Sequence, residues 1–412
     1  MKIAEMKENR NNTPNVPNCR FSESDQARLN SRAGGNYPTL RFSEFKDKWK
    51  IKTLESLSAK IGDGIHGTPK YDDNGEYYFI NGNNLADGNI KINEQTKRVS
   101  DDEAIKHKRD LGPRTLLLSI NGTVGNVAFY KEEKVMLGKS AAYLNIEDYI
   151  DVDFIYHVLS TPKTQYFFYS ELTGTTIKNL SLKSIRETRI ATPILEEQTK
   201  IAGFLQKIDE RIYTQNKIIE DQESLMKGLM QQIFTQQLRF KTNDGRIFPN
   251  WKEKKLGKIL QIGSGRDYKH LQLGNIPVYG TGGYMTSVNE YLYNGESVGI
   301  GRKGTIDKPI LLTGKFWTVD TLFFTHSFKD VIPYFVLLLF KQINWLKYNE
   351  ASGVPSLSKT TIEKIKVKIP DLEEQTKIAN FLSAFNEKLK KEKQILENYQ
   401  QQKKYLLQNL FV

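Results

Sequence analysis

The sequence predicts a mixed α/β protein built as a tandem repeat of two α+β globular units, each followed by a long helix. Two observations lead to this prediction. The eight residues LEEQTKIA occur at 195–202 and again at 372–379, an offset of 177 residues. Each copy opens a long stretch in which apolar residues recur at alternating intervals of four and three. An identity of this length within one chain indicates a duplication, and such repeats determine architecture.

The repeat extends beyond this octapeptide. Leu-Arg-Phe begins at Leu40 and again at Leu238, and a tryptophan follows each copy, at Trp49 and Trp251. From Leu-Arg-Phe to the octapeptide the first half runs 155 residues and the second 134, and the contents differ almost completely. We predict a flexible N-terminal tail over 1–36, a globular unit over 37–193, a central helix over 194–238, a second globular unit over 239–370 and a C-terminal helix over 371–412.

The long helices carry a narrow apolar stripe that is typical of helix packed against helix. The alternative is two amphipathic core helices. Gln215 and Glu392 interrupt the stripe at the same position of each copy, and Asp371 with Glu374 forms a capping-box pattern. The predicted helix-packing or subunit-interface residues are Leu195, Ile201, Leu205, Ile208 and Ile212 in the first helix, and Leu372, Ile378, Leu382, Phe385 and Leu389 in the second.

The globular units show strand and helix patterns. Alternating and β-branched runs predict strands over 114–120, 127–130, 276–279, 309–312 and 317–324. Helical patterns over 153–171 and 330–350 occupy the same place in each half. Each unit is therefore expected to be α+β.

The composition excludes several classes of protein. The single cysteine, Cys19, rules out a disulfide framework or a cysteine-built zinc site and fits a reducing compartment. No apolar run reaches the length of a membrane span, and the N-terminus lacks a signal-peptide core. We therefore expect a cytoplasmic protein without a membrane partner.

The positive charge is concentrated in one half of the chain. The net charge is +12, and residues 239–370 supply +10 of it, whereas residues 37–193 are nearly neutral. A basic domain suggests a polyanion, most simply the DNA backbone, whose binding releases counterions. The alternative is a generally basic protein with no such partner.

The sequence matches no catalytic or cofactor-binding motif in full. Residues 299–304 match the dinucleotide fingerprint, but Pro309 and Gly314 prevent the helix that it requires, so we predict a strand end and a turn. Residues 138–140, Gly-Lys-Ser, resemble the end of a phosphate loop, but Glu133 stands where its first glycine belongs. The five histidines lack metal-ligand spacing, and an Asp-Pro-Pro-Tyr-like adenine methyltransferase motif is missing. We expect a non-catalytic chain without a cofactor or metal of its own.

Glycine-rich loops with basic or amide side chains are the candidates for DNA contact. Arginine and lysine can reach guanine O6 and N7, and asparagine can pair with adenine; the alternative for each is a solvated loop residue. The candidates are His66, Lys70, Asn81, Lys97, Arg98 and Asn121 in the first unit, and Arg266, Lys269, His270, Arg302, Lys303 and Lys315 in the second. Residues 121–124 and 303–306 predict a shared structural turn, with unlike neighbours that would read sequence.

Two unlike globular units, each followed by a like helix that opens with Pro-x-Leu-Glu-Glu-Gln at 193–198 and 370–375, resemble the specificity subunit of type I restriction–modification systems. The resemblance covers residues 37–412. It implies that each globular unit is a target recognition domain that reads one half of a split double-stranded DNA site. It also implies that the two helices pack antiparallel and hold the domains in a pseudo-twofold relation at a fixed separation.

The resemblance further implies partners. Two modification subunits would bind S-adenosylmethionine, methylate adenine N6 and dock on the outward helix faces, and two restriction subunits would use ATP and Mg²⁺. Two alternatives differ in class. A fused enzyme with its own methyl-transfer chemistry is disfavoured by the missing motif. A coiled-coil scaffold with two accessory domains, indifferent to DNA, stays open.

Overall fold

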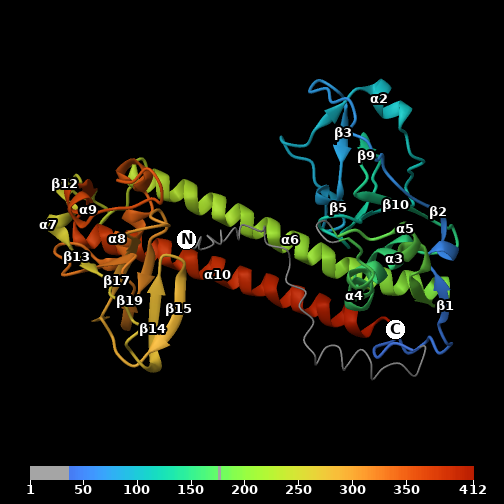
Figure 1. Cartoon of the computed structure of the whole chain (residues 1–412). Helices are drawn as coiled ribbons and strands as arrows, with labels where there is room; N and C mark the ends of the chain where they lie inside the picture. The colour runs from blue at the N-terminus through green and yellow to red at the C-terminus, as the bar shows by residue number, and fades with distance from the viewer. Residues whose placement is uncertain (1–36, 175–177) are drawn as a thin grey trace, which may run out of the picture. The chain divides into compact units, whose positions relative to one another are not determined.

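The computed structural model describes residues 37–174 and 178–412, so the predicted tail lies outside the described residues. The chain forms two compact units (Figure 1). Unit 1 runs up to Thr214 and includes Leu396–Val412, and unit 2 is Gln215–Ile395. Each unit combines a globular region with one end of each long helix, α6 (Leu195–Phe234) and α10 (Leu372–Asn409).

Unit 1 contains a central four-stranded sheet in the order β2-β10-β7-β8 and a three-stranded sheet in the order β6-β3-β9, with small pairs β1-β11 and β4-β5. The strands are β1 (Lys50–Thr53), β2 (Ser58–Asp63), β3 (Tyr77–Ile80), β4 (Leu85–Ala86), β5 (Asn89–Ile90), β6 (Arg98–Val99), β7 (Thr115–Ser119), β8 (Val127–Phe129), β9 (Val135–Leu137), β10 (Ala141–Ile146) and β11 (Arg189–Thr192).

Unit 2 contains a central four-stranded sheet in the order β13-β20-β17-β18, a second sheet in the order β15-β14-β19-β16 and the pair β12-β21. The strands are β12 (Lys252–Lys255), β13 (Gln261–Ser264), β14 (Leu273–Gly280), β15 (Gly283–Val288), β16 (Tyr293–Asn294), β17 (Ser297–Gly301), β18 (Ile310–Leu312), β19 (Lys315–Thr318), β20 (Leu322–His326) and β21 (Lys366–Ile369).

Short helices cover the sheets. In unit 1 they are η1 (Glu55–Leu57), η2 (Gly82–Asn84), α2 (Asp101–Lys106), α3 (Val152–Leu159), α4 (Pro162–Ser170) and α5 (Leu182–Glu187). In unit 2 they are α7 (Leu256–Ile259), α8 (Pro333–Phe340), η3 (Trp345–Tyr348) and α9 (Lys359–Lys364).

The two units repeat one topology, which confirms the tandem repeat and the mixed α/β class. The order β2-β10-β7-β8 in unit 1 corresponds to β13-β20-β17-β18 in unit 2. Beside each central sheet lies one parallel pair, β3 with β9 and β14 with β19. The duplication has therefore kept the framework, although the residues between the repeated anchors differ.

Three predicted elements are each divided in two. The helix expected over 153–171 is α3 and α4, because Pro162 starts a new helix with Thr161 as its cap. The helix expected over 330–350 ends at Phe340 and is followed by η3. The strand expected over 317–324 is wrong as one element: β19 ends at Thr318 and β20 begins at Leu322. The turn predicted after the glycines of 299–304 is confirmed.

The repeated octapeptide joins each long helix to the start of its globular unit. In unit 1 the buried Glu197 accepts two 2.7 Å hydrogen bonds from Arg41 of the Leu-Arg-Phe segment. In unit 2 the buried Glu374 accepts from Arg239 at 2.7 and 3.1 Å and from the Trp251 indole at 3.1 Å. We call each of these pairs, Arg41–Glu197 and Arg239–Glu374, a clamp. Such paired, charge-assisted bonds fix orientation.

The capping box predicted for α10 is half formed. The Asp371 carboxylate accepts from the backbone N–H of Glu374 at 2.9 Å, as expected. The Glu374 carboxylate is turned to Arg239 and Trp251 instead of completing the box. Gln375, the next residue of the octapeptide, binds the loop before α8: its side-chain oxygen accepts from the backbone N–H of Ile332 at 3.1 Å.

The predicted helix stripe is largely buried. Ile201, Leu205 and Ile208 belong to the core of unit 1, and Ile378 and Leu382 to that of unit 2. Ile212, Phe385 and Leu389 are partly buried. Leu195 and Leu372 are 43% and 49% exposed, so they do not pack between the helices, and the subunit-interface role stays a prediction for these two. They lie in the first turn of each helix, outside the stripe.

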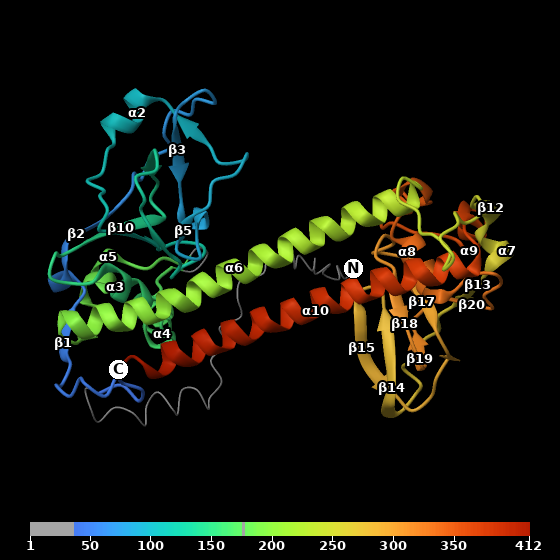
Figure 2. The ribbon, with the colours of Figure 1, turned by 180° about the vertical axis from the view of Figure 1, so that it is seen from behind.

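Within each unit the helix segments run antiparallel, as expected from the resemblance. In unit 1 the first turns of α6 lie along the last turns of α10 (Figure 2), and Asp209 pairs with Lys403 at 2.5 Å. In unit 2 Gln215 contacts Glu392. The helix ends also complete the cores: Leu406 belongs to the same hydrophobic core of unit 1 as Trp49 and Phe154.

Candidate nucleic-acid interface

Four loops of unit 1 meet at one end of the central sheet. β2 and β7 end there, β10 begins there, and the parallel strands β3 and β9 also end there. We call this the loop edge of unit 1; it consists of residues 64–66, 81–84, 121–125 and 138–140. Backbone bonds tie the loops together: Ile65 donates to Leu137 at 2.9 Å, Gly138 to Ile80 at 2.8 Å, and Ile120 to Ser140 at 3.0 Å.

Unit 2 has an equivalent loop edge, which consists of residues 265–266, 280–283, 302–305 and 319–321. The backbone N–H of Arg266 donates to Thr318 at 2.9 Å, that of Val319 to Tyr279 at 3.0 Å, and that of Arg302 to Thr321 at 2.7 Å. These three bonds repeat the three bonds of unit 1. The two edges therefore have the same backbone arrangement but carry different side chains.

Glycines make both edges possible. A Cβ atom at Gly64 would lie 2.1 Å from the Leu137 carbonyl oxygen, and one at Gly265 would lie 1.9 Å from that of Val319. Gly122 and Gly304 adopt φ of 75° and 93°, a left-handed conformation that favours glycine. This confirms the shared turn predicted at 121–124 and 303–306. In both units the glycine lets the chain turn.

The structure brings together half of the predicted DNA-binding residues. His66, Asn81 and Asn121 lie on the loop edge of unit 1. Arg266, Arg302 and Lys303 lie on that of unit 2, with all three side chains exposed. Basic side chains thus gather on the loop edge of the more strongly charged half of the chain.

Two of the residues on the unit 1 edge have bonds within the fold. The Asn81 side-chain oxygen accepts from the Ser140 hydroxyl at 2.8 Å, so it holds one loop against another. His66 Nε2 lies 2.8 Å from Asp63 Oδ2. Asn121 continues the edge by a bridge to Asn179.

The other predicted residues of unit 1 lie away from its loop edge. The Lys70 backbone N–H donates to Glu103 of α2 at 3.3 Å. Lys97 and Arg98 belong to the region of β6, and the Arg98 guanidinium stacks on Tyr78 at 4.8 Å and donates to its hydroxyl at 2.9 Å. These three residues lie by the smaller sheet and α2.

In unit 2 the remaining candidates flank the second sheet. The His270 ring lies edge-on to Trp317 of β19 at 6.1 Å, and Lys269 precedes it in the same loop. Lys315 begins β19 at the end opposite the loop edge, with its Nζ 5.1 Å from the Tyr291 ring. Lys315 is therefore separated from Arg266 and Lys303 by the length of the strand.

Sequence reasoning missed two exposed residues of the loop edges, Lys139 and Asp320. Lys139 lies in the turn from β9 to β10, where the sequence Gly-Lys-Ser at 138–140 resembles the end of a phosphate loop rather than a DNA-binding loop. Asp320 lies in the turn from β19 to β20, where one continuous strand was expected. Alignment of the two halves by strand order would have revealed both residues.

Neither loop edge contains the constellation of a metal centre. Over residues 37–174 and 178–412, no three His, Cys, Asp or Glu side chains are grouped so that they could hold a metal ion. The loop edges instead offer arginine and lysine donors, amide groups and one carboxylate. Such a set can bind phosphates and the edges of bases.

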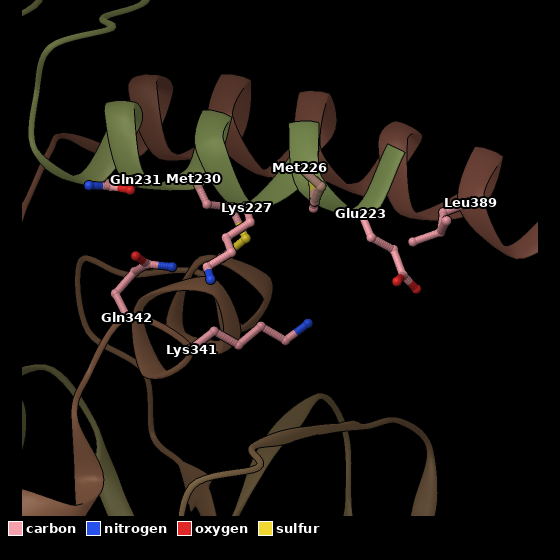
Figure 3. Close-up of a pocket in the computed structure, with 8 residues that line it drawn as sticks. All are labelled: Glu223, Met226, Lys227, Met230, Gln231, Lys341, Gln342 and Leu389. Carbon is pink, nitrogen blue, oxygen red and sulfur yellow. The ribbon is translucent and has the colours of Figure 1, made fainter. Parts of the chain in front are cut away.

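Unit 2 also contains a pocket of about 380 Å³ between α6, α10 and the end of α8 (Figure 3). Met226, Met230 and Leu389 give it an apolar wall, and Lys227 and Lys341 lie at its rim. Leu389, predicted in the helix stripe, therefore borders this pocket. None of the predicted DNA-binding residues lines it.

A family model described as the type I restriction modification DNA specificity domain matches residues 46–222 and again 249–398. Together these matches cover most of the chain and include both loop edges. The chain belongs to the type I restriction–modification specificity family. The two matches fall on the two halves of the repeat, and each includes a globular region and the first part of the long helix that follows it.

Relatives agree with this assignment. The specificity subunit is 25% identical over 374 residues to the type I restriction enzyme MjaVIII specificity subunit of Methanocaldococcus jannaschii, covering 81% of this chain and 84% of that one. It is 24% identical over 414 residues to the putative MjaX specificity subunit of the same organism, covering 90% and 95%. It is therefore a DNA-specificity component and is not itself an enzyme.

Solved structures support the fold. The S subunit of a type I system from M. genitalium superposes with a TM-score of 0.60 at 21% identity, covering 91% of this chain and 99% of that one. A chain from a study of complex assembly and conformational transition of the type I R-M system gives a TM-score of 0.53 at 13% identity, covering 88% and 97%. Within the described part of this specificity subunit, no helix has the length and apolar character to cross a membrane.

Proposed function

We propose that this specificity subunit recognises a two-part site in double-stranded DNA, with one half-site read by each loop edge. The observation that carries the proposal is the pair of equivalent edges: the same backbone bonds present Asn121 in unit 1 but Lys303 in unit 2, with His66 and Arg266 on the neighbouring loops. A shared framework with unlike exposed side chains is what reading two different sequences requires. Two copies of a purely structural domain would not require different exposed side chains on the same framework.

The two edges differ in how they would hold DNA. Unit 2 presents Arg266, Arg302 and Lys303 together, and residues 239–370 carry most of the net charge. Phosphate contacts from such residues provide affinity and position the protein, while base contacts provide specificity. Unit 1 carries fewer cations, so we expect its half-site to depend more on polar contacts from residues such as Asn121.

The helices would dock the partners. Identical residues of the repeat are exposed in both units: Leu195 and Leu372 are 43% and 49% exposed, and Phe204 and Phe381 are 40% and 39% exposed. Apolar side chains that are identical and exposed twice fit one kind of partner that binds twice. We propose two modification subunits on these faces, which carry S-adenosylmethionine and methylate adenine N6. Two restriction subunits, with ATP and Mg²⁺, would then join this cytoplasmic complex.

The length of the helices would set the gap between the half-sites. Because α6 and α10 are continuous over 40 and 38 residues, each spans about 57–60 Å at 1.5 Å per residue. A rigid spacer of this kind predicts a constant number of unread base pairs. A scaffold that is indifferent to DNA predicts neither half-sites nor a gap, which gives a direct test.

The test is a genome-wide adenine-methylation map of cells that express this chain with a candidate modification subunit. Cells that express the modification subunit alone are the control. A new two-part motif with a constant gap would support the proposal and give both half-sites. A stable complex that adds no motif would overturn it in favour of the scaffold.

A double variant sharpens the test. In Arg266→Ala with Lys303→Ala, both substitutions lie on the loop edge of unit 2, so one half-site should lose its definition while the other stays. A matched control is Lys254→Ala with Lys315→Ala, two cations of the same unit away from the edge. Loss of both half-sites in the control but not in the edge variant would contradict the placement of the interface.

A further inference from the structure

The turns that lead into β10 and β20 present opposite charges at one structural position. Lys139 is the middle residue of turn 138–140, and Asp320 is the middle residue of turn 319–321. Both are exposed, whereas Gly138 and Val319, which precede them, are buried. The fold therefore places a cation in unit 1 where it places a carboxylate in unit 2.

Each turn is held on a fixed backbone. Ala141 donates to Gly138 across the first turn at 3.0 Å, and Leu322 donates to Val319 across the second at 2.9 Å. The bonds already described tie the same turns to the neighbouring loops on both sides. A side chain that projects from so constrained a backbone can hold a defined position, as specific recognition requires.

Both charged groups lack a partner among the residues that the structure describes, since no hydrogen bond or ion pair there involves the Lys139 ammonium or the Asp320 carboxylate. Arg302 lies close to Asp320, but its Nη1 donates to the Asp320 backbone carbonyl, at 3.5 Å. The carboxylate is thus available to an external donor.

The sign of the charge restricts what Asp320 can meet. Phosphates repel a carboxylate, so a contact with the DNA backbone does not explain an exposed Asp320 on an edge that carries Arg266, Arg302 and Lys303. In the major groove, a carboxylate accepts from the N4 amine of cytosine, whereas lysine donates to O6 and N7 of guanine. The opposite charges at this position match opposite base edges.

We propose that Lys139 and Asp320 are corresponding specificity-determining residues of the two units, with Lys139 reading a guanine and Asp320 a cytosine. This inference rests on the proposed function, since it assumes that the loop edges meet DNA. It goes further because it assigns one base pair of each half-site to one named residue. Substitution of a base-reading residue should change the motif and keep the general affinity for DNA, whereas loss of a phosphate contact lowers that affinity for every sequence.

The experiment maps adenine methylation with the full chain and one modification subunit, in the wild type and in Asp320→Lys, Asp320→Asn and Lys139→Asp. Asp320→Lys should replace cytosine by guanine at one position of one half-site, with about a tenfold change in base preference. Asp320→Asn should relax the same position toward adenine. Lys139→Asp should replace guanine by cytosine in the other half-site.

Matched controls carry the same charge changes away from the loop edges: Glu290→Lys lies beyond the far end of β15, and Lys106→Asp lies at the end of α2. Both should keep the wild-type motif. If the wild type has a two-part motif and all three edge variants keep it unchanged, the assignment is overturned while the proposed function stands. If the wild type has no such motif, both fail. The near-isosteric Asp320→Asn decides the matter should Asp320→Lys fail to assemble.

Discussion

Gln215 of α6 donates from Nε2 to the carboxylate of Glu392 at 2.7 Å and to its backbone carbonyl at 3.1 Å. Glu392 is the residue that repeats Gln215 at the offset of 177. In an antiparallel pair of repeated helices, a residue meets its own equivalent only where the two copies cross. A polar contact at that point in an apolar stripe is a device that fixes register.

Replacement of Glu392 by leucine should destabilise unit 2. The Gln215 side chain is 7% exposed, so its amide would lose its acceptor inside the helix pair, at a cost of about 1–3 kcal/mol. Leucine at both positions should instead match or exceed the wild-type free energy of unfolding. Urea unfolding followed by circular dichroism measures both. A single variant as stable as the exposed control Glu210→Leu would contradict the role assigned to this contact.

The two repeated tryptophans should respond differently to the same change. Trp251 donates its indole N–H to Glu374 at 3.1 Å, whereas the buried Trp49 indole nitrogen has no acceptor among the described residues. Trp251→Phe should therefore cost more than Trp49→Phe, by about 1.5–3 kcal/mol for a bond to a charged group. Denaturant unfolding of the two variants provides the comparison, each serving as the volume control of the other. Equal costs would show that the indole bond adds nothing.

The stability of unit 1 should fall in mild acid because of His157. This ring is 1% exposed, and burial, with repulsion from Lys403 as a smaller cause, lowers its pKa from 6.5 to about 3. Above pH 6.5 the ring is neutral in both states. Between pH 6.5 and about 3 the unfolded chain takes up a proton that the native state refuses. The contribution of His157 is thus fully present above pH 6.5 and is lost at about 1.4 kcal/mol per pH unit below it.

His157→Gln should remove this component of the pH dependence, and unfolding free energies measured between pH 4 and pH 8 would show it. His66→Gln is the control, because that ring is exposed on the loop edge. If the wild type and His157→Gln lose stability in parallel as the pH falls, the buried histidine is not responsible.

Shortening both helices should shorten the gap between half-sites. Deletion of 212–218 from α6 and the repeat-equivalent 389–395 from α10 removes one heptad from each, about 10.5 Å at 1.5 Å per residue. At 3.4 Å per base pair, the unread gap should lose up to about three base pairs, with both half-sites unchanged. The methylation map measures the gap directly. An unchanged gap in an assembled complex would contradict the proposal that helix length sets the gap.

The salt dependence of DNA affinity should separate two lysines of unit 2. Lys303 lies on the loop edge and Lys315 at the opposite end of β19. Lys303→Ala removes one cation from the loop edge, so it should weaken binding and reduce the slope of log affinity against log salt by about one. Lys315→Ala should change neither. Titration of the assembled complex with its mapped duplex at several salt concentrations gives both slopes, and identical slopes would refute this difference.

The framework could be predicted because the repeated residues have structural roles that few other residues can fill. Glu197 and Glu374 must meet an arginine, and Gly122 and Gly304 must turn the chain, so these identities persisted. The stripe residues Ile201 and Ile378 are predictable for the same reason, since burial at a helix contact leaves a periodic pattern. Leu195 and Leu372 are exposed because they precede the periodic stripe, which begins at Ile201 and Ile378.

The loop edges were predicted only in part. Arg266 and Lys303 stood out as cations beside glycines, but Asp320 was hidden inside a run of strand-forming residues from Trp317 to Phe324. No glycine or proline marks the break between β19 and β20; tertiary pairing of each strand in a different sheet creates it. Lys315 also follows a glycine, Gly314, and only strand order shows that it lies at the end of β19 opposite the loop edge.

The clamps also bear on the segments that lie between their two residues. Arg41 and Glu197 are 156 residues apart and Arg239 and Glu374 are 135 apart, yet both pairs close the same joint. The clamp is therefore the same whatever the number and identity of the residues between its arginine and its glutamate. Segments of different length and content can therefore end at the same joint, provided that their core residues fit the buried helix residues such as Ile201 and Ile378. One arginine and one glutamate thus let a single helix design serve two unlike recognition segments.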